Sequence, residues 1–443
     1  MNNLVATFKE HLEKNFSELL DTPFLIACSG GVDSMVLVSL CQQLSLNFGI
    51  AHCNFELRAE ESDGDERFVQ ETAHLLQIPL FQNRFDTTKE AKTRKKSIQV
   101  TARELRYQWF KELIATQNFE FVLTAHHLDD VLETYLINLS RSTGIEGLTG
   151  IPERNKHIVR PLLLFSREQL LSYALQEEIS WREDSSNQGI KYLRNQLRHS
   201  VIPALKGTNQ NFLQNFKHTI DFLSESQDFI RCQIDAISKQ IIRKTSDNEF
   251  EILIEKLKVY PNPSFILYQL LKDYNFTAWK DINRLLTAES GKFVTSPTHQ
   301  ISKHRKVLIV APTNLEIANS TAFYPITESD TTVCFPGGML KMTQVKEYTK
   351  ASINEIYIDQ ERLSFPLRIR KKEEGDYFYP LGLGGKKKIS KFFRDEKLSL
   401  PEKEKVWILS SGDKVVWIIN HRADERFKVK SNTNKIVKIV FYE

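Results

Sequence analysis

The chain has few of the features that mark secreted, membrane-bound or zinc-binding proteins. Its 443 residues include only five cysteines, none at the paired spacing of a disulfide framework or a zinc site, which favours a cytosolic protein. No run of about 18 apolar residues occurs, so we expect no membrane span. Residues 1–16 mix acidic and basic side chains and lack the apolar block of a signal peptide.

Internal repeats, low-complexity segments and the nucleotide-binding loop G-x-x-x-x-G-K-[ST] are also missing. What is present is an alternation of strand-like and helix-like runs over about the first 200 residues, which predicts a mostly parallel sheet covered on both faces. The strand-like runs are 46–53, 80–85 and 120–125, and the helical runs are 60–76, 97–116 and 129–139.

Changes in this pattern predict three domains. Residues 1–207 form an α/β domain with a doubly wound parallel sheet. Residues 208–320 are rich in apolar residues at helical spacing and form a mainly helical middle domain, and residues 321–443 form a small α+β C-terminal domain. Ligands of doubly wound sheets bind beyond the carboxyl ends of the strands, so polar residues that follow the predicted strands are site candidates.

A turn of small residues follows the first apolar run. It consists of Ser29, Gly30, Gly31, Val32, Asp33 and Ser34. Apolar residues on both sides predict strand, tight turn and helix, and the two glycines permit a positive φ and close backbone approach. Free N–H groups and the positive end of the helix favour an anion, so we expect bound phosphate. The string SGGVDS resembles the PP-loop signature of ATP pyrophosphatases, which split ATP between the α- and β-phosphates.

A second polar cluster, residues 124–134, opens the helix predicted at 129–139. Asp130 and Glu133 are three residues apart and share a helix face. Carboxylates near a phosphate site suit Mg²⁺ or a substrate ammonium group, and His126 suits hydrogen bonding or proton transfer. The alternative is a helix cap formed by Asp129 beside surface histidines.

Other polar segments are ambiguous from the residues alone. Arg58 lies in a polar run after a predicted strand. Arg103 and Arg106 share one side of a helix, where they either reach phosphates or form a solvated face. Residues 140–152 are punctuated by glycine, and residues 181–198 combine an acidic loop with a helix that carries two arginines.

Together these segments resemble the tRNA(Ile)-lysidine synthetase family of PP-loop enzymes. The resemblance runs through SGGVDS, HCNFELR, ARELRY, TAHHLDDVLET, RSTGIEGLTGIP and WREDSSN…RNQLR, in family order. It implies adenylation of C2 of the wobble cytidine of an isoleucine tRNA with a CAU anticodon, through O2, with release of pyrophosphate from ATP. The ε-amine of free L-lysine then displaces AMP. The implied cofactors are ATP and Mg²⁺.

The resemblance also implies roles for individual residues. The loop Ser29 to Ser34 would bind ATP, with Asp33 as the Mg²⁺ ligand, and Arg106 and Arg198 would contact phosphate or adenylate. The implied catalytic set is Asp33, Arg106, His126, Asp130, Glu133 and Arg198. The implied substrate-binding set is Arg58, Arg103, Asp130, Glu133, Lys386, Lys387, Lys388 and Lys391.

The chain departs from the family pattern at several positions. They are Phe55-Glu56 in place of His-Gly, Gln99 in place of Glu, Val131 in place of Gln, Ser142 in place of Gly, and Ser185 in place of Pro. None removes an expected ATP ligand. The departures bear on fine contacts to the anticodon and on local loop shape.

A basic segment near the C-terminus is the predicted tRNA surface. Residues 366–430 hold 17 Lys and Arg against 10 Asp and Glu, and this region resembles the tRNA-contacting domain of the family. Lys386–Lys388 and Lys391 would engage phosphates. We expect Phe392 and Phe393 in the core of the small domain rather than stacked on bases.

Two other functions compete with this one. A PP-loop tRNA thiolase needs an iron–sulfur cluster or a reactive cysteine pair. Cys28 and Cys53 end strand-like runs near the predicted crevice, but no C-x-x-C occurs, and buried thiols are common core residues. A noncatalytic, ATP-regulated tRNA-binding protein would not need the acidic pair. We expect a cytoplasmic enzyme without a membrane partner, and the sequence leaves the oligomeric state open, a homodimer included.

Overall fold

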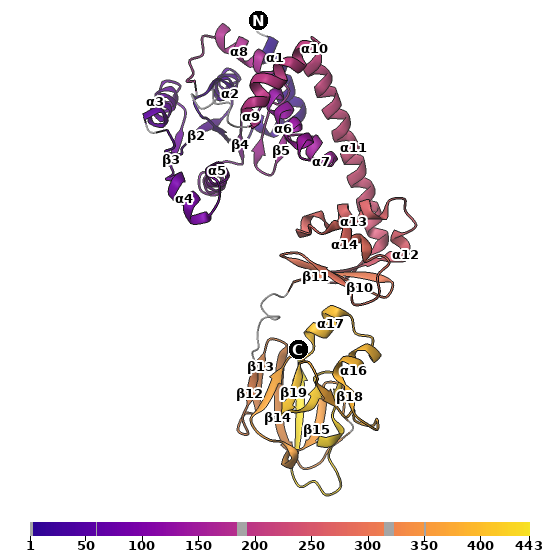
Figure 1. Ribbon diagram of the computed structural model, residues 1–443. Coiled ribbons are helices and arrows are strands. Elements are labelled where there is room, and N and C mark those ends of the chain that lie inside the picture. Colours follow the sequence, from indigo (N-terminus) through magenta and orange to yellow (C-terminus); the bar gives the residue numbers. More distant parts are fainter. Residues whose placement is uncertain (1–2, 59, 184–192, 314–322, 350) are drawn as a thin grey trace. The chain divides into compact units, whose positions relative to one another are not determined.

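The structure is a computed structural model that describes residues 3–58, 60–183, 193–313, 323–349 and 351–443. It divides into two compact units, Met1–Arg231 and Cys232–Glu443, which are described separately (Figure 1). In the described ranges, no helix is long and apolar enough to cross a membrane. Ser185 lies outside the described residues, and the domain boundaries after residues 207 and 320 stay a prediction.

A six-stranded sheet in the order β3-β2-β1-β4-β6-β5 forms the centre of the first unit. Its strands are β1 (Phe24–Ala27), β2 (Phe48–Asn54), β3 (Leu80–Arg84), β4 (Phe121–Leu123), β5 (Arg154–Asn155) and β6 (Ile158–Val159). All neighbouring strands pair in parallel except β5 and β6. The predicted parallel sheet is therefore confirmed.

Helices cover both faces of this sheet (Figure 1). They are α1 (Asn3–Asn15), α2 (Val32–Gln43), α3 (Glu60–Leu75), α4 (Thr87–Arg94), α5 (Ile98–Thr116), α6 (Leu128–Ser140), α7 (Ile145–Leu148), α8 (Arg167–Gln176), α9 (Leu193–Gln196) and α10 (Ile202–Thr208), with a 3₁₀ helix η1 (Ser17–Leu20) and a π-helical segment η3 (Leu197–Val201). Alternate residues of a strand face opposite sides. Phe24 and Ile26 accordingly share a core with Val36 of α2, whereas Leu25 shares one with Phe110 of α5.

The strand order reverses between β1 and β4, because β1 is followed by β2 on one side while β4 lies on the other. Such a switch point opens a crevice beyond the carboxyl ends of the two strands. The turn of residues 29–34 follows β1, and His126 and His127 follow β4. Two of the predicted site segments thus follow the two strands at the switch point.

Helix α11 (Phe212–Ile241) continues into the second unit, which begins with a mixed α/β region. Its helices are α12 (Ile254–Leu257), α13 (Pro263–Leu271), η4 (Lys272–Tyr274) and α14 (Trp279–Arg284). Beside them lies an antiparallel sheet in the order β7-β8-β11-β10-β9, formed by β7 (Ile242–Ser246), β8 (Glu249–Leu253), β9 (Phe293–Thr295), β10 (His299–His304) and β11 (Val307–Pro312). The region predicted as mainly helical therefore also contains a five-stranded sheet, whose Ile301 and Leu308 share a core with Leu267 of α13.

The described residues of the rest of the second unit form antiparallel sheets, α-helices and short 3₁₀ helices. The sheets have the strand orders β12-β16-β19-β20-β21, β13-β14-β22-β15 and β17-β18. The elements are β12 (Tyr324–Ile326), β13 (Thr332–Phe335), β14 (Gly338–Val345), β15 (Glu355–Asp359), η5 (Gln360–Arg362), β16 (Leu367–Arg370), β17 (Tyr377–Phe378), β18 (Lys387–Lys388), α16 (Ile389–Asp395), α17 (Leu400–Lys405), β19 (Ile408–Ser411), β20 (Lys414–Ile418), β21 (Arg422–Ala423), η6 (Glu425–Phe427) and β22 (Ile436–Tyr442). Phe392 and Phe393 are each 2% exposed and pack with Ile408 and Ile418, so their predicted core position is confirmed.

Candidate active site

The turn after β1 is folded as an anion-binding loop. Gly30 has a φ of 85°, which favours glycine, and a Cβ there would meet Phe68 and Val69 of α3 at 3.4 Å. Gly31 is extended and forms the N-cap of α2. Inside the loop, the Ser34 hydroxyl donates to the Gly31 carbonyl at 2.9 Å. The first-turn amides of α2 have no intrahelical acceptors, which is the arrangement predicted to hold phosphate.

Asp33 stands in the first turn of α2 and faces the neighbouring strand end. Its Oδ2 lies 3.6 Å from His127 Nε2. Its Oδ1 is buried and has no hydrogen-bond partner among the described residues. An unpartnered carboxylate oxygen beside a phosphate loop fits a Mg²⁺ ligand, because Mg²⁺ is commonly held by one or two carboxylates together with substrate phosphates. In the described part of the chain, no cluster of three or more His, Cys, Asp or Glu side chains forms a metal site by itself.

His127 joins the loop to helix α6. It is 1% exposed, and its Nε2 lies 3.5 Å from Asp130 Oδ2 as well as near Asp33. Burial favours the neutral ring, but a hydrogen bond with Asp33 and the charge of Asp130 outweigh it, so the pKa of His127 is raised. No role for this histidine was predicted from the sequence.

Asp130 and Glu133 form a buried acidic pair, as their spacing predicts. Glu133 is 1% exposed. It accepts from Arg198 Nε at 2.5 Å and from Arg194 Nε at 2.7 Å. Asp130 Oδ1 accepts from the same two guanidinium groups, at 3.2 Å from Arg194 Nη2 and 3.4 Å from Arg198 Nη2. Arg194 and Arg198, one helical turn apart, therefore hold both carboxylates. We call these two side chains the arginine clamp.

The pKa values of this cluster follow from burial and from the charged neighbours of each group. Burial raises the pKa of Asp130, but its neighbours, His127 first, outweigh it, and the net shift is downward. Burial lowers the pKa of Arg198, but its hydrogen bond to Glu133 reverses the shift, and the pKa is raised. Asp130 and Arg198 therefore stay ionised at neutral pH.

His126 differs from His127 in the direction of its pKa shift. Burial lowers its pKa to about 4, so the ring is neutral at pH 7. Its Nδ1 is hydrogen-bonded to the Thr124 hydroxyl at 2.8 Å. A neutral imidazole with one nitrogen fixed in this way is suited to hydrogen bonding rather than to charge neutralisation.

Asp129 does not cap its own helix. Its Oδ2 accepts from the backbone N–H of Arg167, at the start of α8, at 2.8 Å, and its Oδ1 pairs with Lys206. The cap of α6 comes instead from Asp130, whose Oδ2 accepts from the His127 N–H at 3.1 Å. The alternative of an Asp129 cap beside surface histidines is therefore wrong.

The remaining predicted arginines of the first unit are placed differently. Arg58 Nη2 donates to Asp65 at 3.1 Å. The guanidinium of Arg106 lies 5.2 Å from the centre of the Phe55 ring, one of the positions that depart from the family pattern, and its charge acts on His126. Arg103 is exposed and stacks over Tyr107 of its own helix.

The predicted tRNA-binding lysines lie in the second unit, around the start of α16. Lys386 Nζ is 3.5 Å from the centre of the Tyr377 ring, and Lys387 pairs with Asp395 at 2.8 Å. Lys388 and Lys391 are exposed.

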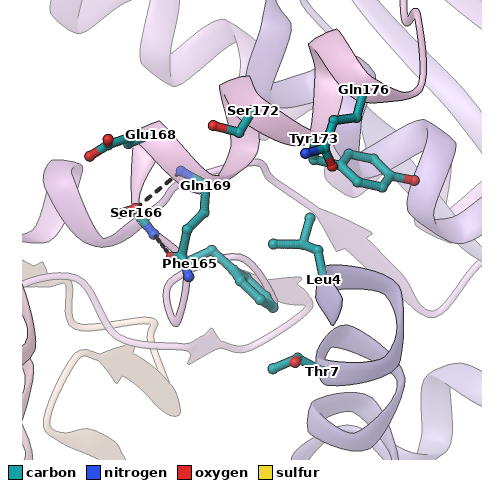
Figure 2. A pocket seen from close by; sticks show the side chains of 9 residues that line it. All are labelled: Leu4, Thr7, Phe165, Ser166, Glu168, Gln169, Ser172, Tyr173 and Gln176. Atoms are coloured by element: carbon teal, nitrogen blue, oxygen red, sulfur yellow. Dashed lines mark hydrogen bonds between the residues drawn. The ribbon is translucent and has the colours of Figure 1, made fainter. Parts of the chain in front are cut away.

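A cavity of about 370 Å³ lies elsewhere in the first unit, between α1 and α8. Figure 2 shows Leu4 and Thr7 on one side and Gln169, Ser172 and Tyr173 on the other. None of its lining residues belongs to the predicted site.

Three segments of the chain match domains of known protein families. Residues 4–205 match the PP-loop domain, residues 245–313 the TilS substrate binding domain, and residues 367–440 the TilS substrate C-terminal domain. The first unit is thus a PP-loop domain.

The family follows from two curated relatives. The tRNA(Ile)-lysidine synthase of Parabacteroides distasonis is 36% identical and covers 99% of this chain and 100% of its own length. That of Bacteroides thetaiotaomicron is 33% identical, with 96% and 97% covered. The chain belongs to the tRNA(Ile)-lysidine synthase family. A solved U34-tRNA thiolase, NcsA from Methanococcus maripaludis, aligns at 14% identity and a TM-score of 0.41, over 49% of this chain and 78% of that chain. Thiolation is not favoured, because the full-length relatives are tRNA(Ile)-lysidine synthases.

Proposed function

We propose that this chain is an ATP-dependent ligase that joins free L-lysine to C2 of the wobble cytidine of isoleucine tRNA with a CAU anticodon. An adenylated cytidine is the intermediate, and AMP and pyrophosphate are the products. The observation that carries the proposal is the meeting of the PP loop with the acidic pair Asp130 and Glu133, which His127 links at one crevice. A site with a phosphate loop and a buried acidic pair side by side suits a reaction of ATP with a cationic amino acid.

In the first step, the loop would grip the departing pyrophosphate. The N–H of Gly31 and the first-turn amides of α2 offer hydrogen bonds to phosphate oxygens. Asp33 would hold Mg²⁺, which supplies neutralisation of the negative charge that develops on the leaving group. Arg106, near His126, would contact the adenylate.

In the second step, the ε-amine of lysine must lose a proton before it attacks, because its reference pKa is about 10.4. Asp130 and Glu133 would attract the ammonium group. His126 is neutral, with Nδ1 engaged by Thr124, and would accept a hydrogen bond from the amine through Nε2. One of these three groups would take the proton.

The tRNA would contact the basic side chains of Lys386–Lys388 and Lys391 around the start of α16. We also propose a cytoplasmic location, which all five cysteines as free thiols support.

One assay separates the candidate functions. The enzyme is incubated with ATP, Mg²⁺, radiolabelled lysine and an isoleucine tRNA transcript, with a methionine tRNA transcript as the control. Label in the isoleucine tRNA alone supports the proposal. Sulfur incorporation in a parallel incubation with an added sulfide donor would instead indicate a thiolase, and tRNA binding without turnover would indicate a noncatalytic protein.

A further inference from the structure

Arg182 lies where the chain crosses the PP loop. Its backbone N–H donates to the Gly30 carbonyl at 2.9 Å. It belongs to the polar segment 181–198, and the proposed reaction gives this residue no task. The contact joins that segment directly to the loop that would hold ATP.

The side chain of Arg182 is fixed on helix α3. Its Nε donates to Asp65 Oδ1 at 2.7 Å. The guanidinium passes over Gly64, where a Cβ would lie 2.8 Å from Nη2 and 3.1 Å from Cζ. Gly30 rests against the same helix through Phe68 and Val69. Helix α3 therefore positions both the loop and the residue that holds it.

The orientation of one peptide follows from these contacts. In a trans peptide, the carbonyl and the next N–H point in opposite directions. Because the Gly30 carbonyl is turned toward Arg182, the N–H of Gly31 points away from it. The partner of that N–H inside the loop is Ser29 Oγ at 3.4 Å, longer than an ordinary N–H···O bond, so the N–H remains available to a phosphate oxygen.

We propose that Arg182 is a positioning residue for the triphosphate of ATP. It holds the peptide between Gly30 and Gly31 so that the Gly31 N–H faces the phosphates, and Gly64 provides the space for its guanidinium. This inference rests on the proposed use of ATP.

The test compares Gly64→Ala, Arg182→Ala and Arg182→Lys in the full-length enzyme, with Gly207→Ala as the control. Gly207 is also helical, and a Cβ there meets nothing within 4 Å. We expect Gly64→Ala and Arg182→Ala to raise the KM for ATP about tenfold and to leave the KM for lysine within about twofold of wild type. Arg182→Lys restores part of the ATP affinity. Alanine is the better helix former, so Gly64→Ala does not lower the melting temperature.

Two results would overturn the inference. One is an unchanged KM for ATP in both Gly64→Ala and Arg182→Ala. The other is a parallel rise in the KM for ATP and for lysine together with a lower melting temperature, which would show a merely structural role. If the wild-type enzyme incorporates no lysine, the proposed function fails, and equilibrium binding of ATP to the same four variants still decides whether Arg182 positions the loop.

Discussion

Replacement of Glu133 by glutamine tests the buried acidic pair most directly. Each carboxylate oxygen of Glu133 now accepts from one arginine, Arg198 on Oε1 and Arg194 on Oε2. Glutamine keeps the shape and one acceptor oxygen, but its amide NH₂ faces one of the two guanidinium groups. One arginine therefore loses its acceptor, and both lose a counter-charge.

The magnitude follows from the exposure of the three side chains. Removal of one partner from a fully buried ion pair costs about 3–5 kcal/mol. Here the side chains of Arg194 and Arg198 are 48% and 23% exposed, against 2% for Glu133, so water and Asp130 compensate in part. We expect the free energy of unfolding to fall by about 1–2 kcal/mol. In a unit of this size, that lowers the melting temperature by about 2–8 °C.

Glu133→Gln should lose more lysine-incorporating activity than its lower stability explains. If Glu133 attracts the lysine ammonium group, its charge is lost from the site itself, and kcat/KM for lysine should drop by about 100-fold or more. Thermal unfolding and lysine incorporation at varied lysine concentration measure the two effects. The control is Glu251→Gln, which removes a carboxylate paired with Arg243 in the second unit and should leave the KM for lysine unchanged. The reasoning is refuted if Glu133→Gln lowers the melting temperature as expected but keeps the wild-type kcat/KM for lysine.

Substitutions at other residues have specific expected effects. Asp33→Asn should lower lysine incorporation by about 100-fold and raise the Mg²⁺ concentration needed for half-maximal rate; an unaltered Mg²⁺ titration would remove Asp33 from the metal site. Replacement of Lys386–Lys388 by glutamine should raise the KM for tRNA and reduce its salt slope by about 2, since Lys387 is already paired with Asp395, and unchanged tRNA binding would reject this surface. The pKa of His126 is about 4, against 6.5 for a free histidine. Between these pH values the unfolded chain binds more protons than the folded chain, so the contribution of His126 to the free energy of unfolding is lost as the pH falls from 6.5 toward 4. Above pH 6.5 that contribution is complete. His126→Gln should therefore make the melting temperature less dependent on pH in that window, and thermal scans with the full wild-type dependence would contradict this assignment.

Whether a strand could be predicted from the sequence depends on how many of its residues are buried. The run around β2 is almost entirely buried and apolar, which is the pattern of a central parallel strand. Strand β7, with the sequence IRKTS, has four exposed residues of five. Nothing in its own composition distinguishes it from a loop, and only its pairing with β8 makes it a strand. Strand β7 was therefore not predictable from local patterns.

In the site as well, contacts between residues close in sequence could be predicted, whereas contacts between residues far apart in the chain could not. Asp130 and Glu133 could be predicted as a pair because three residues of helix fix a common face. Arg194 and Arg198 show helical spacing too, but the contact with Glu133 spans more than 60 residues of chain, and spacing along the chain does not encode it. The bond from Arg182 to Gly30 uses only backbone atoms of both residues and leaves no signature in the sequence.

The arginine clamp balances the charge of the acidic pair in the proposed lysine site. Asp130 and Glu133 carry two negative charges, and Arg194 and Arg198 carry two positive ones, so a lysine ammonium group that joins them leaves an excess positive charge. An anion at the PP loop would offset that excess. In the proposed reaction, the phosphates of ATP would thus act as an electrostatic co-ligand for lysine, and by thermodynamic reciprocity each substrate would tighten the binding of the other.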